Sequence, residues 1–342
     1  MNRFDERYIF RRAMYDDADE LMRFIADEWP KKNHIFAINK DFFLYEFQDG
    51  DLLNFVIAVN KSTNEIDGMF GFYPASDIKE KLDIWTCMWL TRRKGSTPFL
   101  GLEILKRMKS IVNYRYLTGV GTDPKTAMPL AMGKANHYGF KFKHFYMISE
   151  QTEYKISIIK SLPTPKKPTG TPPATLALIK SVNELSDSSK NAFGFSIPLK
   201  NEWYINKRYF CHPIYEYLVW EIISENENGI LVGREIQQNG TRILRIVDFI
   251  GSPELLDGLF DEFFALKQNY EYIDFYVHGV DDIHIMNAGF TLKTEDDGNV
   301  IPHYFEPFIQ SNIDVYGTSE IPNVRMCKAD ADLDRPNICQ NL

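Results

Sequence analysis

The sequence predicts an α/β (α+β) protein with two consecutive domains, each a mixed, mostly antiparallel sheet flanked by helices. Strand-like and helix-like segments follow one another in the same order in both halves of the 342-residue chain. The halves repeat this plan with a period near 150 residues, which indicates a duplicated domain. Between them, residues 162–173 contain five prolines, typical of a stiff connector. We therefore expect domains at 1–150 and 176–342 and a linker at 151–175; the alternative is a long surface loop.

The elements of the first half follow from apolar periodicity between turn residues. Asp16 and Asp17 supply carboxylates to the start of a helix that ends at Pro30. Gly139 is a plausible cap for the last helix. We expect helices after Asp17, at 40–47, from Pro98 to about 111, and at 125–138. We expect strands at 8–14, 54–60, 66–73, 83–91, 116–121 and, closing the domain, 140–149.

The second half repeats this order. An aromatic-rich stretch at 201–217 takes the place of the short first-half helix at 40–47. We expect strands at 176–182, 218–223, 229–237, 243–250 and 272–278, and helical segments at 183–193, 254–267 and 281–289.

Composition limits the function classes. A net charge of −8 argues against nucleic acid as the main partner. The cysteines have no CxxC spacing, which favours a reducing cytoplasm over disulfides or a metal site; they are Cys87, Cys211, Cys327 and Cys339. The first ten residues lack an apolar signal region, and no run approaches the length of a membrane span. We expect a cytoplasmic protein without a metal or a membrane partner.

A basic loop follows the strand at 83–91 and leads into a helix after Pro98. It comprises Arg92, Arg93, Lys94, Gly95, Ser96 and Thr97. The free N–H groups of a first helical turn and the helix dipole together attract anions. The sequence therefore predicts an anion site here, with an ordinary strand–loop–helix connection as the alternative.

The element order and this loop resemble the GNAT (GCN5-related N-acetyltransferase) superfamily over residues 8–149. The family loop reads (Gln/Arg)-x-x-Gly-x-(Gly/Ala); Arg92 and Gly95 match it and Thr97 departs from it. Alignment on the helix instead retains Gly101 and places Phe99 at the earlier glycine. The resemblance implies that acyl-coenzyme A binds at this loop. The implied binding residues are Arg92, Arg93, Lys94, Gly95, Ser96, Thr97, Phe99, Leu100 and Gly101.

The expected chemistry is attack of an amine on a thioester. A backbone N–H near Trp89 or Leu90 would polarise the carbonyl. An amine of pKa about 7.7–8.0 is roughly one-tenth neutral at pH 7, so a base has little to do. A water chain could serve as the base, and the candidate side chains are Asp83, the first choice, His34 and His137. For each of them a structural role is favoured over a catalytic one: a solvated strand end for Asp83, a surface turn for His34 and a helix cap for His137. Many family members carry a tyrosine at the position of Ala135, where it acts as the acid for the leaving thiolate. In this chain that acid is absent or comes from elsewhere.

The second half lacks the basic loop, because residues 251–254 contain no arginine or lysine and include Glu254. We expect this half to serve the acceptor or only the architecture. The tail at 328–337 resembles amino-sugar N-acyltransferases of bacterial surface-polysaccharide (O-antigen and capsule) pathways, close to those acting on dTDP-3-amino-3,6-dideoxyhexoses. The acceptor residues predicted with this resemblance are Trp85, His212, Asp330, Asp332, Asp334 and Arg335.

Alternatives remain at this point. Arg335 and Lys328 could simply neutralise the acidic row of the tail. The row does not fit an EF-hand, because Arg335 and Asn341 stand where that loop needs glycine and glutamate. A tandem-GNAT transferase using aminoacyl-tRNA is a second enzyme hypothesis, disfavoured by the net charge. A GNAT-like protein that binds without catalysis is the third hypothesis.

Overall fold

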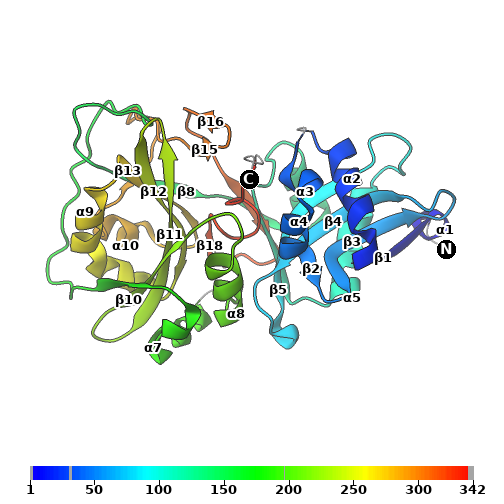
Figure 1. Cartoon of the computed structure of the whole chain (residues 1–342), viewed down its shortest axis with the longest axis horizontal. Coiled ribbons are helices and arrows are strands. Elements are labelled where there is room, and N and C mark those ends of the chain that lie inside the picture. Colours follow the sequence, from blue (N-terminus) through cyan, green and yellow to red (C-terminus); the bar gives the residue numbers. More distant parts are fainter. Residues whose placement is uncertain (1–2, 31–32, 196, 338–342) are drawn as a thin grey trace. The chain divides into compact units, whose positions relative to one another are not determined.

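The computed structural model describes residues 3–30, 33–195 and 197–337, and the chain forms two compact units. Unit 1 contains the residues up to Gly139, the segment Gly317–Ile321 and the chain from Arg335 onward. Unit 2 contains Phe140–Tyr316 and Pro322–Asp334. Figure 1 shows that blue and cyan ribbons make up most of unit 1, and green to orange ribbons most of unit 2. The predicted fold class, two helix-flanked and mostly antiparallel sheets, is confirmed.

The sheet of unit 1 is antiparallel except for the β5–β6 pair, which is parallel. One face packs on an apolar cluster that includes Ile104 and Met108, because the buried residues of α5 recur at helical spacing. The strands in sheet order are β1 (Tyr8–Met14), β3 (Leu52–Asn60), β4 (Ile66–Pro74), β5 (Asp83–Thr91), β6 (Tyr116–Val120) and β17 (Tyr316–Ser319), with β2 (Gln48–Asp49) beside β3. The helices are α1 (Arg3–Arg7), α2 (Ala18–Glu28), α3 (Ile35–Ile38), α4 (Lys40–Phe47), α5 (Leu100–Val112) and α6 (Ala127–Ala135). Strand β7 (Tyr138–Lys141) spans the division between the units.

The sheet of unit 2 repeats the pattern, with a parallel β12–β13 pair in an otherwise antiparallel sheet. Its main core lies under the helices that follow β12 and β13. The strands in sheet order are β9 (Thr175–Ile179), β10 (Leu218–Ile223), β11 (Asn228–Gln238), β12 (Thr241–Ile250), β13 (Tyr272–His278), β8 (Lys143–Ile148) and β14 (Thr291–Leu292), with β18 (Met326–Cys327) also on β13. The helices are α7 (Asp187–Asn191), α8 (Glu202–Ile205), α9 (Phe260–Lys267) and α10 (Asp282–Asn287), and a 3₁₀ segment, η6 (Pro253–Leu259), precedes α9. A hairpin of β15 (Tyr304–Phe305) and β16 (Phe308–Ile309) completes this unit.

Two expectations about chain organisation differ from the structure. Strand β8, expected to close the first domain, pairs with β13 in unit 2, and β17 pairs with β6 in unit 1 instead. The start of the expected linker packs into unit 2, where Ile156 is buried and the Ser157 N–H donates to Glu271 at 2.7 Å. Strands β8 and β17 each pair with a strand that is distant in the sequence. Local sequence patterns therefore could not predict to which of the two sheets either strand belongs.

One expected helix end also differs. Helix α6 ends at Ala135, and Asn136 caps it in the left-handed conformation (φ 57°), three residues before Gly139. Asparagine tolerates this conformation because its side chain hydrogen-bonds locally.

Candidate active site

Strand β5 extends beyond its pairing with β6, so its last residues have no β6 partner on that side. The pairing runs from Asp83 opposite Tyr116 to Thr86 opposite Gly119, and β6 ends at Val120. Beyond it, β5 has a bulge at Met88, which has φ 43° and falls at the register shift against β4. Bulges redirect a strand and recur beside active sites. We call the region beside these unpaired β5 residues the unit 1 slot.

The backbone N–H groups that face this slot can be identified from the hydrogen-bond pattern. The Arg92 N–H donates to the Asp67 carbonyl of the neighbouring chain segment at 2.8 Å. Antiparallel pairs alternate between hydrogen-bonded and non-bonded, so Leu90 directs its N–H toward β4. The N–H groups of Trp89 and Thr91 then point toward the slot. Of the two N–H groups predicted to polarise a carbonyl, that of Trp89 faces the slot and that of Leu90 faces β4.

The outer end of the slot meets the start of α5. Phe99 precedes the helix in the left-handed conformation (φ 69°), and Leu100 donates its N–H to the Thr97 carbonyl at 3.1 Å. A β-carbon on Gly101 would lie 2.8 Å from Nε1 of Trp89, so only glycine lets this first turn lie so close to β5. First-turn geometry leaves the N–H groups of Gly101 and Leu102 without acceptors in the helix. They form a partial positive charge beside the slot.

The cations of the loop point mostly to acidic partners within unit 1. Nε of Arg92 contacts the buried Asp67 carboxylate at 2.9 Å, and its Nη2 donates to Ile66 O at 2.8 Å. Arg93 donates from its backbone and side chain to Glu28. Lys94 is exposed and has no ion pair within the described chain. The structure therefore gives the two arginines a loop-shaping role and leaves Lys94 and the helix N–H groups for an anion.

The remaining loop residues are fixed by neighbours from the start of the chain. Thr97 bonds the Tyr8 hydroxyl through both its N–H, at 3.0 Å, and its side chain. Ser96 donates its hydroxyl to Arg92 O at 2.7 Å, and Gly95 (φ 87°) accepts a hydrogen bond from Arg7. The loop is thus ordered before any ligand binds.

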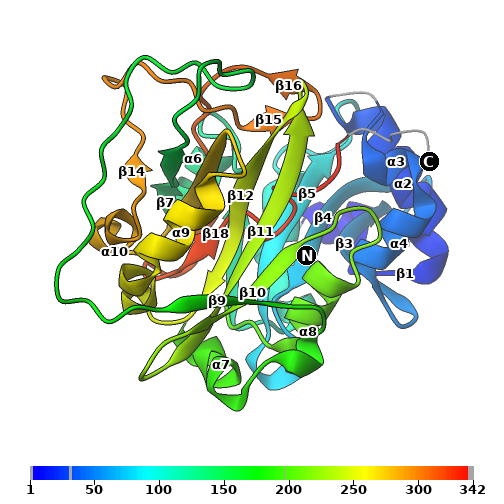
Figure 2. The same cartoon turned by 60° about the vertical axis from the view of Figure 1, so that its left-hand side comes forward.

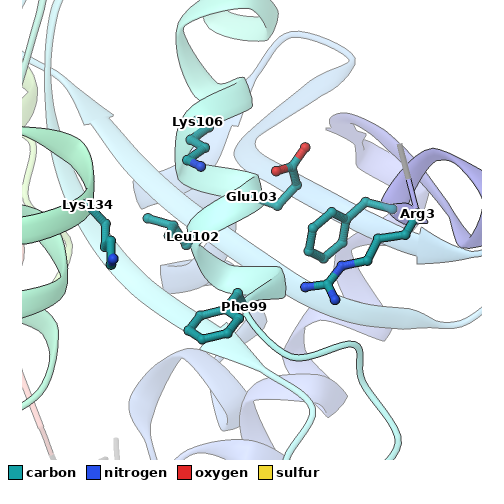
Figure 3. Close-up of a pocket in the computed structure, with 7 residues that line it drawn as sticks. Arg3, Phe99, Leu102, Glu103, Lys106 and Lys134 are labelled. Carbon is teal, nitrogen blue, oxygen red and sulfur yellow. The ribbon is translucent and has the colours of Figure 1, made fainter. Parts of the chain in front are cut away.

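A hollow of about 280 Å³ lies on the outer side of α5 (Figure 3). Its rim carries three cations and one carboxylate, Arg3, Lys106, Lys134 and Glu103. Phe99 stands at its edge with 64% of its surface exposed, unusual for a phenylalanine. An aromatic ring beside lysines suits a ligand with a planar base and a phosphate.

Asp83 and His34 do not have the properties of a general base at this slot. Asp83 is buried at the opposite end of β5, where Arg115 holds it through two bonds of 2.8 and 2.6 Å. It lies roughly 16 Å along the strand from the Met88 bulge. His34 faces two donors, the Phe36 N–H and Nη2 of Arg335, while a neutral imidazole has one acceptor nitrogen. Burial and the Arg335 charge lower the pKa of His34 to about 2, so it stays neutral.

The other predicted histidines and Trp85 are also structural. Burial lowers the pKa of His137, which follows α6. Burial and then Arg208 lower the pKa of His212 to about 3, and its Nδ1 accepts from the N–H groups of Ile214 and Tyr215 at 3.2 and 2.9 Å. Trp85 is fully buried in the middle of β5.

In unit 2, the corresponding opening is filled by the chain itself. Strands β12 and β13 are paired from Leu244 opposite Ile273 to Ile246 opposite Phe275. Beyond that point β18 pairs with β13, and the Ala329 N–H donates to Val247 of β12 at 2.9 Å. Figure 2 shows this segment in red beside β12. We call residues 326–330 the plug and the space that they fill the unit 2 slot.

Buried ion pairs hold the plug and the residues after it. Lys200 contacts Asp330 at 2.7 Å and Asp248 at 2.6 Å, and Arg234 contacts Asp334 at 2.7 Å. Burial and then Asp248 raise the pKa of Asp330 to about 6, although Lys200 opposes the shift. Burial alone would raise the pKa of Asp334, but the charge and the hydrogen bonds of Arg234 lower it below its usual range.

These contacts correct the expectation for the tail. Lys200 and Arg234, and not Lys328 and Arg335, compensate Asp330 and Asp334. Both carboxylates are fully buried and occupied, whereas Asp332 is half-buried and Arg335 belongs to unit 1. The predicted row of three acceptor-binding carboxylates is therefore not formed.

Sequence reasoning missed four residues at the inner end of the unit 1 slot. They are Thr86, Gly119, Thr122 and Thr318. No motif links them, and Thr318 joins them only because β17 pairs with β6. The one local signal for this group was the pairing of Thr86 in β5 with Gly119 in β6, because a glycine leaves room for a neighbouring side chain.

Comparisons with known proteins reveal similarity of fold alone. No protein-family model matches the chain, and no curated protein sequence does. A GCN5-related N-acetyltransferase from Anabaena variabilis is 8% identical with a TM-score of 0.56, covering 92% of this chain and 72% of that one. A probable N-acyltransferase from Enterococcus faecalis is 9% identical with a TM-score of 0.53, covering 90% and 72%. A GCN5-related N-acetyltransferase from Kribbella flavida is 10% identical with a TM-score of 0.50, covering 91% and 70%.

Neither a metal-ligand cluster nor a membrane-spanning helix is present among the described residues. Across residues 3–30, 33–195 and 197–337, no group of three or more His, Cys, Asp or Glu side chains could hold a metal ion. Within the same residues, no helix has the length and apolarity needed to cross a bilayer. Cys87, Cys211 and Cys327 form no disulfide within the part of the chain that the structure describes, and Cys339 lies outside it.

Proposed function

We propose that unit 1 transfers an acyl group from acyl-coenzyme A to the amine of a second substrate. The observation that carries this proposal is the edge of β5 that faces the unit 1 slot without a strand partner. The N–H groups of Trp89 and Thr91 lie along this edge, and the edge ends near the start of α5. The likeness of the fold to GCN5-related N-acetyltransferases supports the reaction type.

Each part of the donor has a complementary surface in unit 1. The pyrophosphate lies at the Gly101 and Leu102 N–H groups with Lys94 beside it. The adenine packs on Phe99 in the hollow, where Lys106 and Lys134 attract the 3′-phosphate. The pantetheine chain follows the edge of β5 into the slot. The thioester carbonyl accepts a hydrogen bond from the Trp89 N–H, which stabilises negative charge in the transition state.

For the acceptor we propose a nucleotide-linked amino-deoxy sugar of bacterial surface-polysaccharide synthesis, on the strength of the tail sequence. The neutral fraction of its amine attacks the carbonyl carbon directly in a ternary complex, because positioning lowers the barrier without a strong base. Asp332 and Arg335 are the tail residues proposed to contact it. The reaction takes place in the cytoplasm, where acyl-coenzyme A is made.

Titration calorimetry with acetyl-CoA tests the donor site. We expect one site per chain, because the plug fills the unit 2 slot. Replacing Lys106 and Lys134 together by alanine should weaken acetyl-CoA binding about tenfold and leave dephospho-CoA binding unchanged. Lys125→Ala is the matched control, an exposed lysine just before α6. Failure of the unmodified protein to bind acetyl-CoA would reject the proposal.

Release of free thiol tests the reaction, with several acyl-CoAs and a panel of nucleotide-linked amino sugars. Thiol release that depends on the sugar supports the transferase. Acetyl-CoA binding without thiol release for any acceptor favours the non-catalytic hypothesis, which the engaged Asp83 and neutral His34 keep open. Transfer from aminoacyl-tRNA would favour the second enzyme hypothesis, a tandem-GNAT transferase that uses aminoacyl-tRNA.

A further inference from the structure

Three threonine hydroxyls meet at the inner end of the unit 1 slot. Thr86 is the last β5 residue paired with β6, and it lies opposite Gly119. Thr318 of β17 pairs with the same glycine from the other side. The position that a β-carbon on Gly119 would take has three nearest atoms, the Oγ1 atoms of Thr86, Thr318 and Thr122, the last two at 3.5 and 3.6 Å. We call these three residues the threonine vertex.

The hydroxyls of the threonine vertex have no hydrogen-bond partner among the residues that the structure describes. Unpaired polar groups that converge on one point indicate a ligand or ordered water. Thr86 and Thr122 are half-buried and keep some surface exposed, whereas Thr318 is buried. Thr118, one residue before Gly119, differs because its hydroxyl is buried and donates to Ile84 O at 3.5 Å.

The corresponding positions of unit 2 carry no hydroxyl. Ile246 and Phe275 form the last pair between β12 and β13, in the register that Thr86 and Gly119 occupy in unit 1. Both side chains belong to the apolar core of unit 2. Hydroxyls therefore occur at the inner end of the open slot and apolar side chains at the inner end of the plugged one.

We propose that the threonine vertex is the hydrogen-bond donor that stabilises the leaving thiolate of the reaction. This inference rests on the proposed function. The amine nitrogen forms a bond to the carbonyl carbon, and the carbon–sulfur bond breaks with its electron pair left on sulfur. A vertex hydroxyl donates a hydrogen bond to this thiolate and keeps its own proton. The attacking nitrogen gives its proton to water, and water supplies the proton that the thiolate takes up.

The other protic side chains proposed for this step are unsuitable. Asp83 is ion-paired at the far end of β5, and His34 is held neutral. Ala135 occupies the place where the resemblance would put an acidic tyrosine. The threonine vertex is the group of hydroxyls that the strand register places inside the slot.

Titration of the thiol of bound CoA tests the inference without an acceptor. The ultraviolet absorbance of the thiolate is followed against pH in complexes with four proteins: the unmodified chain, Thr86→Val, Thr86→Ser and the control Thr118→Val. Valine keeps the shape of threonine but removes the hydroxyl, and serine keeps the hydroxyl. We expect the thiol pKa in the unmodified complex to lie about one pH unit below that of free CoA, because hydrogen bonds to a charged group favour the charged form.

In Thr86→Val this lowering should disappear, while Thr86→Ser and Thr118→Val retain it. In the transfer assay, kcat should fall about 10- to 100-fold in Thr86→Val, with the KM for acetyl-CoA within about threefold. A bound thiol with the same pKa in the unmodified protein and in Thr86→Val overturns the inference and leaves the proposed function intact. No CoA binding by the unmodified protein overturns both.

Discussion

The slots of the two units have the same strand geometry and opposite contents. In each unit, two parallel strands separate after a short run of pairing, at Thr86 and Gly119 in unit 1 and at Ile246 and Phe275 in unit 2. In unit 1 the separated edges lead to the start of a 13-residue helix and to unpaired hydroxyls. In unit 2 the plug occupies the space and bonds to both strands.

This difference shows two ways of satisfying the same exposed backbone. Separated strands leave N–H and C=O groups that must find partners. In unit 2 the plug supplies these hydrogen-bond partners permanently, and its carboxylate, Asp330, is paired with the buried Lys200. Unit 1 leaves them to water or to a ligand, which is the property that a binding site needs. The following variants test this contrast, from the largest expected effect to the smallest.

Asp334→Ala should cost the most stability. It leaves Arg234 buried without its carboxylate, which typically costs about 3–5 kcal/mol. Urea unfolding measures the change, and acetyl-CoA binding to the folded protein should persist. The control is Asp261→Ala, which breaks an exposed ion pair with Lys167 in the same unit and should cost less than about 1 kcal/mol. Equal losses in the two variants would show that Asp334 does not secure the plug.

Gly101→Ala should damage the open slot. The new methyl group would lie 2.8 Å from the Trp89 indole, so the first turn of α5 must move away from β5. We expect a loss of about 1–3 kcal/mol in stability and at least about tenfold weaker acetyl-CoA binding. Gly133→Ala is the control, because a β-carbon there meets nothing within 4 Å, and helical alanine should stabilise by about 0.5–1 kcal/mol. If Gly101→Ala binds acetyl-CoA with unchanged affinity, the ligand does not bind at this end of α5.

Asp330→Asn should change how stability depends on pH. The pKa of Asp330 is raised to about 6, so the folded protein binds its proton more tightly than the unfolded chain. Its stabilising contribution is full below about pH 4 and is lost as the pH rises through about 6. Over this range the unmodified protein should lose about 2 kcal/mol relative to Asp330→Asn. A difference between the two urea-unfolding curves that stays constant from pH 4 to 8 would contradict this assignment.

Lys328→Met should stabilise unit 2 slightly. The Lys328 amine is buried beside His303 at 3.2 Å, and no described carboxylate lies within ion-pair distance. Burial lowers its pKa well below the usual value, so at neutral pH the unfolded chain binds the extra proton and is favoured. We expect a gain of about 1 kcal/mol near pH 7, measured by thermal unfolding. A loss of stability would mean that the amine makes a necessary hydrogen bond.

The fold could be predicted because its signals are local. Apolar periodicity locates most strands and helices, and the duplication is visible from one chain. The exchange of β8 and β17 could not be predicted, because either strand suits either sheet by composition. The bulge at Met88 and the left-handed Phe99 are imposed by packing and have no local sequence preference behind them.

The position of the candidate site stays a prediction, and the structure agrees with only some of the residue roles expected for it. The strand, loop and helix around Arg92 do form the open end of the slot. The roles predicted for charged residues do not agree with the structure where a partner distant in the sequence pairs with the charge. Arg115 pairs with Asp83 in this way, and Lys200 pairs with Asp330. Such partners lie far apart in sequence, and net charge along the chain does not reveal them. The threonine vertex was missed for the same reason, since β17 brings Thr318 from the far end of the chain.

The position of β17 has a consequence for synthesis on the ribosome. Strand β6 waits for a partner encoded roughly 200 residues later, because Gly317, Thr318 and Ser319 pair with Val120, Gly119 and Thr118. At roughly 5–20 residues per second this interval lasts roughly 10–40 s. Throughout it, the nascent first unit presents an unprotected strand edge, the kind of surface on which chains aggregate. We therefore expect a gene truncated after codon 139 to yield a product that aggregates, because β6 then never receives its β17 partner.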